Sequence, residues 1–556
     1  MASSPKVLDA TGRPMLPAMP ASKAKPGANS YWPPTDLAPG GVFPYDAANW
    51  QTQEMGNWVP WIRSPDAEIN IFRDRMVARI RDLARNDGWV AGAIGRVLDS
   101  TIGGNYRLSA KPDYDALSLI DRAFDADWAD EFQVTVEALW RGHAANIGRY
   151  NDTSRQMTFT QQCRLALRHH VIDGEALIVS HWMPERVAPL ASHYATSFLV
   201  VDPDRLSNPD QMVDTQYLRG GVEIDNHGVP LAYHIRKAHQ NDWYNSVESM
   251  QWERVEREDP DGWLRVIHAF DHERAGQNRG VSLFAPIISR LKMLARFYGV
   301  TLQAATVAAT FGTYVTSPYD PAMVEDALDG GDEELNSYQA IRADWAEHRP
   351  ALLNGVRVPT LAPGEKIESV SAERPSGEFS PFTHEMLRGL AAVLGVSAEQ
   401  VTNDYSESSW SSARAGIVEA EKTFERRCDN FDSDVATPMY ATWLREPLEA
   451  GLLPLPRSVG VSNVLELLTP LSRCEWLGAA RGWVDPVAER QGAILGLDAA
   501  FSTLEKECAK QGMDWRENIR QRARERRMFE ELGLPPPAWS GQEITATEAS
   551  QKPEAE

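Results

Sequence analysis

The chain has 556 residues, and its 56 Lys and Arg against 78 Asp and Glu give a formal net charge of -22 at pH 7. This length exceeds one ordinary hydrophobic core and predicts about two to four modules, while a mean hydropathy of -0.40 argues against a membrane-spanning helix. The four cysteines are far apart and form no C-x-x-C pair, so neither a zinc site nor a disulfide framework is indicated, and a reducing compartment fits.

The N-terminal region differs in composition from the rest of the chain. Its first 45 residues hold nine prolines with many Ala, Gly and Ser. Such a segment cannot bury enough apolar surface to order itself, and it lacks the basic, apolar and small-residue order of a secretory signal. We therefore expect an extended arm over residues 1–64.

Helical patterns follow the arm. Ser64 and Pro65 favour a helix start, because a small polar cap and a proline suit the first positions of a helix. Apolar residues then recur at spacings of three and four: Ile69, Phe72, Met76, Ile80 and Leu83. Gly88 interrupts this pattern, and we expect a second helix to about 102, a strand at 106–110 and a helix over 116–147.

The middle of the chain alternates between helix and strand signals. Thr158 or Thr160 can cap a helix through Val171, and the turn at Asp173 and Gly174 leads into a predicted strand. The predicted strands cover 176–182, 198–201, a hairpin over 221–235 and 264–270. Residues 282–311 are strongly helical, and thirty residues at about 1.5 Å each give a rod of about 45 Å.

The last third is mainly helical. We expect an acidic helix over 325–349, strands within 355–371, helices over 412–534 broken by proline-rich turns, and a polar disordered tail over 540–556. The fold class is therefore α+β, with long helices flanking a β-rich stretch.

The sequence offers little chemistry. It contains no G-x-x-x-x-G-K-[ST] loop and no G-x-S-x-G elbow, so ATP hydrolysis by that loop and hydrolase chemistry by that elbow are not indicated. His268 and His272 are the best metal candidates, but a strand would hold them about 13 Å apart, and we interpret them as structural. His169 and His170 are interpreted as a polar helix end. We expect no catalytic residue, cofactor or metal; a metal-dependent hydrolase using His268 and His272 is the enzymatic alternative.

The most distinctive stretch lies between a predicted helix and turn and a long charged helix, and reads DYSESSWSSARAG over residues 404–416. It resembles the portal proteins of the lambda type, although Trp410 stands where that family usually has Tyr. Four further blocks match in the family's order: RDLARNDG at 81–88, GQNRGVS at 276–282, WVDP at 483–486 and STLEKECAKQG at 502–512.

The resemblance implies a structural protein that forms a twelve-fold ring at one vertex of a viral capsid, the channel for packaging and ejection of double-stranded DNA. It implies the major capsid protein, the large terminase subunit and a head-tail connector protein as partners. The implied location is the virion, with the host cytoplasm during assembly. Another virion head-tail adaptor or minor capsid protein is the alternative. No membrane partner is expected.

The resemblance also implies a portal fold with wing, stem, clip and crown. The expected boundaries are 65–157 for the first part of the wing, 158–175 for stem helix 1, 176–280 for a β-containing clip, 281–311 for stem helix 2, 312–411 for the second part of the wing, and 412–539 for a mainly helical crown.

Candidate site residues follow from charge, from side-chain size and from the polar loop at 404–412. This loop is interpreted either as a tunnel loop that grips DNA or as a lock between subunits that uses Arg414. Candidate DNA-channel residues are Arg290, Lys292, Arg296, Asp404, Tyr405 and Ser406. Candidate subunit-interface residues are Gly299, Ala304, Ala305, Ala308 and Arg414. A rival tunnel loop lies at 372–380. A second basic cluster, interpreted as a solvated face with i,i+4 pairs or as a DNA contact, comprises Arg516, Arg520, Arg522, Arg524, Arg526 and Arg527.

The acidic charge allows two interpretations. Tight nucleic-acid binders usually have a basic footprint, whereas an acidic surface would let DNA pass through a conduit without adhering. A few Lys and Arg per subunit would then supply the phosphate contacts. Alternatively, the acidity serves only solubility.

Overall fold

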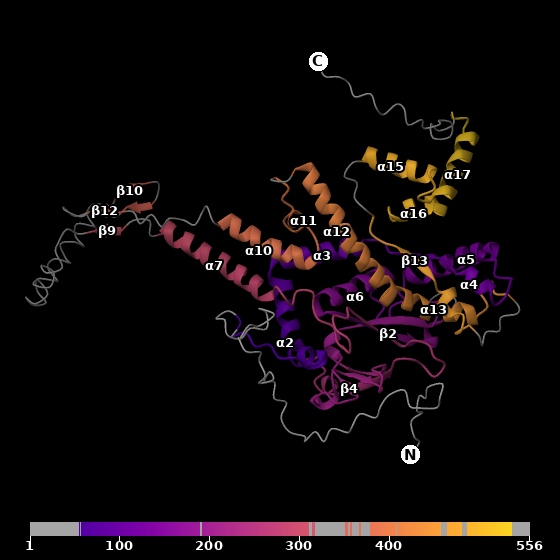
Figure 1. The fold of residues 1–556 in the computed structure, drawn as a ribbon, viewed down its shortest axis with the longest axis horizontal. Coiled ribbons are helices and arrows are strands. Elements are labelled where there is room, and N and C mark those ends of the chain that lie inside the picture. Colours follow the sequence, from indigo (N-terminus) through magenta and orange to yellow (C-terminus); the bar gives the residue numbers. More distant parts are fainter. Residues whose placement is uncertain are drawn as a thin grey trace, which may run out of the picture. The chain divides into compact units, whose positions relative to one another are not determined.

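The computed structural model describes residues 55, 57–188, 192–310, 314–316, 351–353, 356–358, 366–368, 379–406, 409–456, 464–480 and 486–535; for 304–310, 379, 410 and the short strands between 314 and 368 it describes the backbone alone. The chain forms two units, Met1–Arg63 and Ser64–Glu556, and the elements from α2 to α17 belong to the second (Figure 1). Most of the predicted arm, the predicted acidic helix and the predicted tail lie outside the described residues.

The first helices confirm the predicted order with shifted boundaries. Helix α2 (Pro65–Asn86) starts where predicted, although the Ser64 side chain makes no capping hydrogen bond. The break before α3 (Gly88–Thr101) lies at Asp87, whose carboxylate accepts from the amides of Trp89 and Val90. Strand β1 (Arg107–Ala110) follows as predicted.

The prediction of one continuous helix over 116–147 is wrong. The structure has α4 (Tyr114–Ser118) and α5 (Ala126–Ala144) instead. Helix α4 ends at Ser118, and α5 starts only after Asp125, whose backbone is extended and whose carboxylate accepts from the Trp128 amide.

Helix α6 (Phe159–Asp173) confirms the predicted cap. Thr158 and Gln161 form a reciprocal capping box, and Gly174 ends the helix with φ of 88°. Strand β2 (Glu175–Trp182) begins at the next residue and is the centre of an antiparallel sheet of order β3-β2-β8. Its partners are β3 (Thr196–Val201) and β8 (Val266–Phe270).

A second antiparallel sheet contains the predicted hairpin. Its strands are β4 (Leu218–Arg219), β5 (Val222–Ile224), β6 (Pro230–Arg236) and β7 (Trp252–Glu256). The Asp225 carboxylate accepts from the His227 and Val229 amides and so shapes the hairpin turn. Short 3-10 turns connect this region at Pro184–Arg186, Pro203–Arg205, Pro209–Gln211 and Glu248–Met250.

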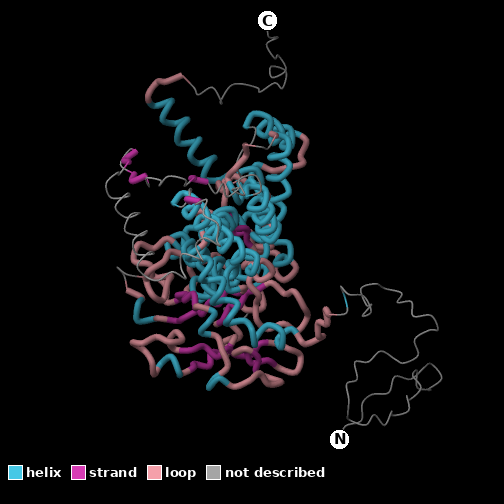
Figure 2. The backbone as a smooth tube through the Cα atoms, turned by 90° about the vertical axis from the view of Figure 1, so that its left-hand side faces the viewer, coloured by secondary structure: helices cyan, strands magenta, loops and turns pink. Residues whose placement is uncertain are grey.

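Strand β2 separates two apolar layers. Ala176 and Ile178 belong to the large core shared with the helices. Leu177 and Val179 alternate to the opposite face and pack with residues of the second sheet such as Tyr233. Figure 2 shows the resulting order, with helices on one side of the strands.

Helix α7 (Ile288–Thr310) starts six residues later than predicted. Residues 283–287 form turns instead, with the Ile287 amide donating to the Phe284 carbonyl. Pro286 explains the shift, because it lacks an N–H and disfavours helix at the residue before it. The 23 residues of α7 span about 35 Å.

The C-terminal half is helical, as predicted, but contains an unpredicted strand. That strand, β13 (Cys474–Leu477), pairs with β1, placing Trp476 opposite Leu108. The helices of this half are α10 (Phe379–Leu394), α11 (Ala398–Thr402), α12 (Trp410–Phe431), α13 (Thr437–Glu449), α14 (Leu468–Leu471), α15 (Pro486–Asp498), α16 (Leu504–Ala509) and α17 (Trp515–Glu531). A π-helical turn, η6 (Asp432–Ala436), joins α12 to α13.

Four short strands lie between α7 and α10. They are β9 (Tyr314–Thr316), which pairs with β12 (Lys366–Glu368), and β10 (Ala351–Leu353), which pairs with β11 (Val356–Val358). Within the described residues, no helix is long and apolar enough to cross a membrane.

Aromatic rings join distant segments in the large core. Trp140 of α5 contacts Phe159 of α6 at 4.9 Å and Trp443 of α13 at 5.0 Å between ring centroids. Trp476 of β13 lies 5.2 Å from Phe159. Helix α13 and strand β13 therefore share a core with α5 and α6.

Trp443 is fully buried at this junction. We expect Trp443→Ala to destabilise the subunit by about 3–5 kcal/mol, because it removes a large buried ring and leaves a cavity. The 92% exposed Trp243 provides the matched control, and Trp243→Ala should change stability by less than about 0.5 kcal/mol. Urea unfolding of both variants measures the difference, and equal midpoints would contradict the assignment of this core.

Candidate functional site

A buried group of charges lies where α2, the start of β2 and residues 276–282 meet. The Glu175 carboxylate has no exposed surface. It accepts from Arg73 at 2.8 Å, from Nε of Arg279 at 3.0 Å and from the Gly280 amide at 2.9 Å. His268 of β8 lies 3.1 Å from the same carboxylate. Four elements are thus joined through one side chain.

The electrostatics of this centre are strong. Burial alone would raise the pKa of Glu175, but the guanidinium groups of Arg279 and Arg73 hold it well below its usual value. Both arginines are also buried, at 3% and 2% exposure. Charges removed from water in this way require close partners.

Arg81 forms a second ion-pair group beside the first. It donates to both carboxylate oxygens of Asp173, at 2.8 and 2.9 Å, and to Asp202 and Asp204 at 2.7 Å each. These bonds connect α2 to the end of α6 and to the turn after β3.

Two glycines bring residues 276–282 against the end of α6. A Cβ atom on Gly280 would lie 2.0 Å from the Gly174 carbonyl oxygen, and Gly174 itself has φ of +88°. A side chain at either position would push these backbones apart. The close approach holds Arg279 over Glu175.

The N-terminal end of α2 is fixed by a third buried carboxylate. Asp66 accepts from the backbone amide of Asn278 at 3.0 Å and from its side-chain amide at 2.8 Å. It also accepts from Arg219 at 3.0 Å. The block at 276–282 therefore contacts both α2 and β2.

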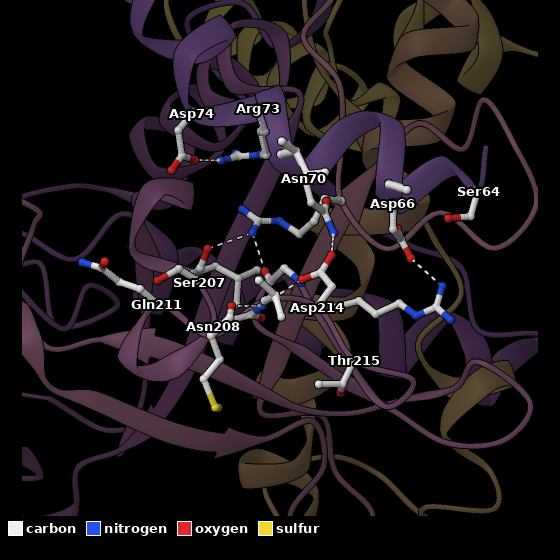
Figure 3. A pocket seen from close by; sticks show the side chains of 18 of the residues that line it. Ser64, Asp66, Asn70, Arg73, Asp74, Ser207, Asn208, Gln211, Asp214 and Thr215 are labelled. Carbon is white, nitrogen blue, oxygen red and sulfur yellow. Dashed lines mark hydrogen bonds and ion pairs between the residues drawn. The ribbon is translucent and has the colours of Figure 1, made fainter. Parts of the chain in front are cut away.

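A cleft of about 610 Å³ opens beside this centre, between the first turns of α2 and residues 206–220 (Figure 3). Asn70 donates to Asp214 across it at 2.7 Å. Ile71 and Val213 at its edge are 72% and 83% exposed. The cleft carries both arginines and carboxylates, so its lining does not select one sign of ligand charge.

The predicted DNA-channel residues of α7 lie on its exposed side. Arg290, Lys292 and Arg296 are exposed, whereas Leu291 and Leu294 are buried in the large core that also holds Leu390 of α10. The Lys292 ammonium lies 3.9 Å from Asp82. Within the described residues, Arg290 and Arg296 form no ion pair.

The predicted interface residues of α7 are only partly visible. Gly299 is exposed, and a Cβ added there would meet no atom within 4 Å. The side chains of Ala304, Ala305 and Ala308 lie outside the described residues, although their backbone continues α7.

The distinctive loop follows α11. Asn403 ends that helix with φ of 57° and accepts from Arg96. Asp404, Tyr405 and Ser406 are exposed. Hydrogen bonds from Ser406 lower the pKa of Asp404.

No hydrogen bond or ion pair joins residues 404–406 to Arg290, Lys292 or Arg296 in the part of the chain that is described. Arg414 of α12 is half-buried. Most of the rival loop at 372–380 lies outside the described residues.

The histidines considered as metal ligands have structural partners. His268 lies beside Glu175 in the buried centre. This position agrees with its interpretation as a structural residue. His169 lies 2.6 Å from Asp173, a contact that its interpretation as a polar helix end missed. His169, Asp173 and Asp202 bring ligand atoms within 4.8 Å of one another, but both carboxylates already form ion pairs with Arg81.

Sequence reasoning missed the ion-pair centre. Its one local signal is Glu175, a carboxylate placed directly before the apolar run of β2. Its partners Arg73 and Arg279 lie about a hundred residues away on either side, so no local pattern could connect them.

A model of the family described as phage portal protein, lambda family, matches residues 51–427. The portal protein of Escherichia phage N15 is 32% identical over 495 residues, covering 88% of this chain and 90% of that protein. Portal protein B of Escherichia phage lambda is 32% identical over 492 residues with the same coverage. The chain belongs to the lambda family of phage portal proteins.

Weaker similarities extend to other particles. The probable portal protein of Halomonas phage phiHAP-1 is 24% identical over 501 residues, covering 88% of this chain and 87% of that protein. A chain from the neck of an empty GTA particle has a TM-score of 0.41 and 12% identity, covering 83% of this chain and 94% of its own length. A structural similarity at that level supports no further inference.

The ion-pair centre predicts the effect of one neutralising change. Glu175→Gln keeps the shape of the side chain but leaves Arg73 and Arg279 buried without their counter-charge, which should cost about 3–5 kcal/mol. The exposed Glu256, paired with Arg254 at 3.2 Å, is the control, and Glu256→Gln should cost less than about 1 kcal/mol. Urea unfolding at pH 7 measures both.

The wild-type protein and the Glu175→Gln variant also test how the stability of the subunit depends on pH. Because the folded-state pKa of Glu175 lies below its unfolded value, its contribution is present above about pH 4.3 and is lost as the pH falls through the folded pKa. The Glu175→Gln variant should lack this loss on acidification. A variant with wild-type stability at pH 7 would contradict the role of the centre.

Proposed function

We propose that this chain assembles into a closed ring whose axial channel conducts double-stranded DNA into and out of a capsid. Membership of the lambda portal family, with portal relatives 32% identical over 88% of the chain, is the observation that carries the proposal. A head-to-tail contact between copies closes into a ring when its rotation divides a full turn, and we propose twelve copies.

The wing, stem, clip and crown assignments belong to this proposal. Helices α6 and α7 would serve as the two stem helices, and the strands from β2 to β8 between them would supply the clip. The exposed side of α7 would then face the channel or the next subunit. The charge of these residues supports this role, since Arg290, Lys292 and Arg296 are exposed cations on α7 in a chain with net charge -22.

The proposed partners follow from the same family. The ring would sit in a shell of major capsid protein, receive DNA from the large terminase subunit, and later bind a head-tail connector protein. The virion portal vertex would be its final location, after assembly in the host cytoplasm. Neither catalysis nor a cofactor is part of this role.

We expect electron microscopy of the purified protein to show closed rings with a pore wide enough for a B-form duplex. Gly299→Leu tests whether α7 forms the contact between copies. Among the described residues, no atom lies within 4 Å of a Cβ added there, but a closely packed neighbouring copy would be overpacked by about 1–3 kcal/mol at each contact. Rings should therefore fail to form while the subunit stays folded.

Gly92→Leu is the matched control, because Gly92 of α3 is also exposed with open space around it. Ala305→Leu extends the test along α7. Mass photometry counts the copies in each case. If both α7 variants form normal rings, the contact between copies does not lie on this part of α7. If the wild type forms only compact monomers or dimers at every concentration and salt, the proposed ring is wrong.

DNA binding by the ring should be weak, independent of sequence and steeply reduced by salt. Each neutralised phosphate adds about -0.9 to the slope of log affinity against log salt concentration. A conduit for a whole genome cannot recognise base edges, because each recognised site would stop the movement. Competition between unrelated duplexes over a salt series measures this, and a preference of about a hundredfold or more for one sequence would contradict the proposal.

A further inference from the structure

Helix α17 has an unusual position for a helix of its length. None of its residues is buried. It lies near the C-terminal end of the described chain, beside α16 (Figure 1). A helix without a buried residue does not owe its place to a core, so its surface needs another explanation.

The first turn of α17 is fixed to the rest of the subunit by ion pairs. Glu517 accepts from Arg107 of β1 at 2.9 Å and lies 3.1 Å from Arg141 of α5. Arg516 forms an ion pair with Asp130 of α5. These contacts set the direction of the helix, and most residues of the following turns are exposed.

Four arginines form one stripe along α17. Arg516, Arg520, Arg524 and Arg527 recur at spacings of four, four and three residues, which places them on the same face. Asp130 neutralises the first of them, and the stripe ends before Glu531. The remaining three, called here the arginine stripe, are exposed and span about 10 Å of helix.

The arginine stripe is not explained by pairing within the helix. Arg526, on another face, does pair with Glu530 at 3.3 Å. Within the described residues, however, Arg520 and Arg524 form no ion pair, and Arg527 reaches only the Ala523 carbonyl of its own helix. Among the described residues, these three neighbouring cations form no ion pair, in a chain whose net charge is -22.

The chemistry of the stripe distinguishes between possible partners. The centre of a protein–protein interface is depleted in charged residues and enriched in apolar and aromatic anchors. The exposed apolar residues Ile519 and Met528 lie to either side of the stripe rather than within it. Interfaces with DNA are instead polar and strongly positive.

We propose that the arginine stripe, Arg520, Arg524 and Arg527, binds the phosphate backbone of double-stranded DNA. This inference rests on the proposed function and adds a DNA contact separate from α7. Guanidinium groups pair well with phosphate oxygens, and contacts of this kind hold the duplex without reading its sequence. The fixed first turn of α17 holds the three groups in a common direction.

The test compares three variants of the full-length protein. The stripe variant carries Arg520→Gln, Arg524→Gln and Arg527→Gln. The charge control removes three other exposed arginines, through Arg75→Gln, Arg79→Gln and Arg388→Gln. The α7 variant carries Arg290→Gln, Lys292→Gln and Arg296→Gln. Fluorescence anisotropy with a labelled duplex of about 30 base pairs gives the affinity over a salt series, and mass photometry gives the assembly state.

We expect the stripe variant to lose roughly tenfold or more in affinity at low salt and its salt slope to fall by about 2 to 3, one unit for each phosphate contact. The charge control should change affinity by less than about threefold, which separates a local contact from the change in net charge. All three variants should retain the wild-type circular dichroism spectrum, because the changed side chains are exposed.

Each other outcome overturns the inference in a different way. If the stripe variant keeps the wild-type affinity and salt slope and only the α7 variant loses affinity for DNA, DNA binding belongs to α7. That result would contradict the inference but not the proposed function. Loss of assembly with unchanged DNA affinity would assign the stripe to a protein partner. A wild-type protein that forms rings without binding DNA at low salt would reject the stripe, and one that forms neither rings nor DNA complexes would reject the proposed function as well.

Discussion

The Glu175 carboxylate is the constraint on which the arrangement of the subunit depends. It is buried at the first residue of the central strand β2 and must be matched by positive charge. Arg73 supplies this from α2 and Arg279 from the segment before α7. Because a buried carboxylate without partners is very costly, these three segments can be close-packed only in one relative position.

Such a centre specifies position more than it adds stability. Buried ion pairs often contribute little net free energy compared with apolar residues of the same volume, whereas removing one partner is costly. The glycines at 174 and 280 serve the same end, since they allow two backbones to approach where any side chain would clash. The direction in which α7 leaves the strand region is set there, which matters for a helix proposed to face a neighbouring copy.

Local features of the fold could be predicted from the sequence, and long-range ones could not. The cap at Thr158 and the hairpin over 221–235 were predictable because the hydrogen bonds of the cap and of the hairpin turn lie within a few residues. The start of α7 was misjudged because apolar spacing outweighed the effect of Pro286. Exposure of the basic residues on α7 is visible only after Leu291 and Leu294 are seen in the core. The ion-pair centre needs partners from segments about a hundred residues apart, for which one sequence offers no signal.

The pairing of β1 with β13 joins Arg107 to Leu477, about 370 residues further along the chain. Ribosomes add about 5–20 residues per second, so β1 waits about 20–70 seconds for its partner strand. During that time its edge is open, and the core that Trp476 completes against Phe159 is unfinished. A truncated chain therefore lacks the closed core of a finished subunit. The core can close only when nearly the whole polypeptide has been synthesised. Incomplete copies would therefore be kept out of any assembly that requires a fully folded subunit.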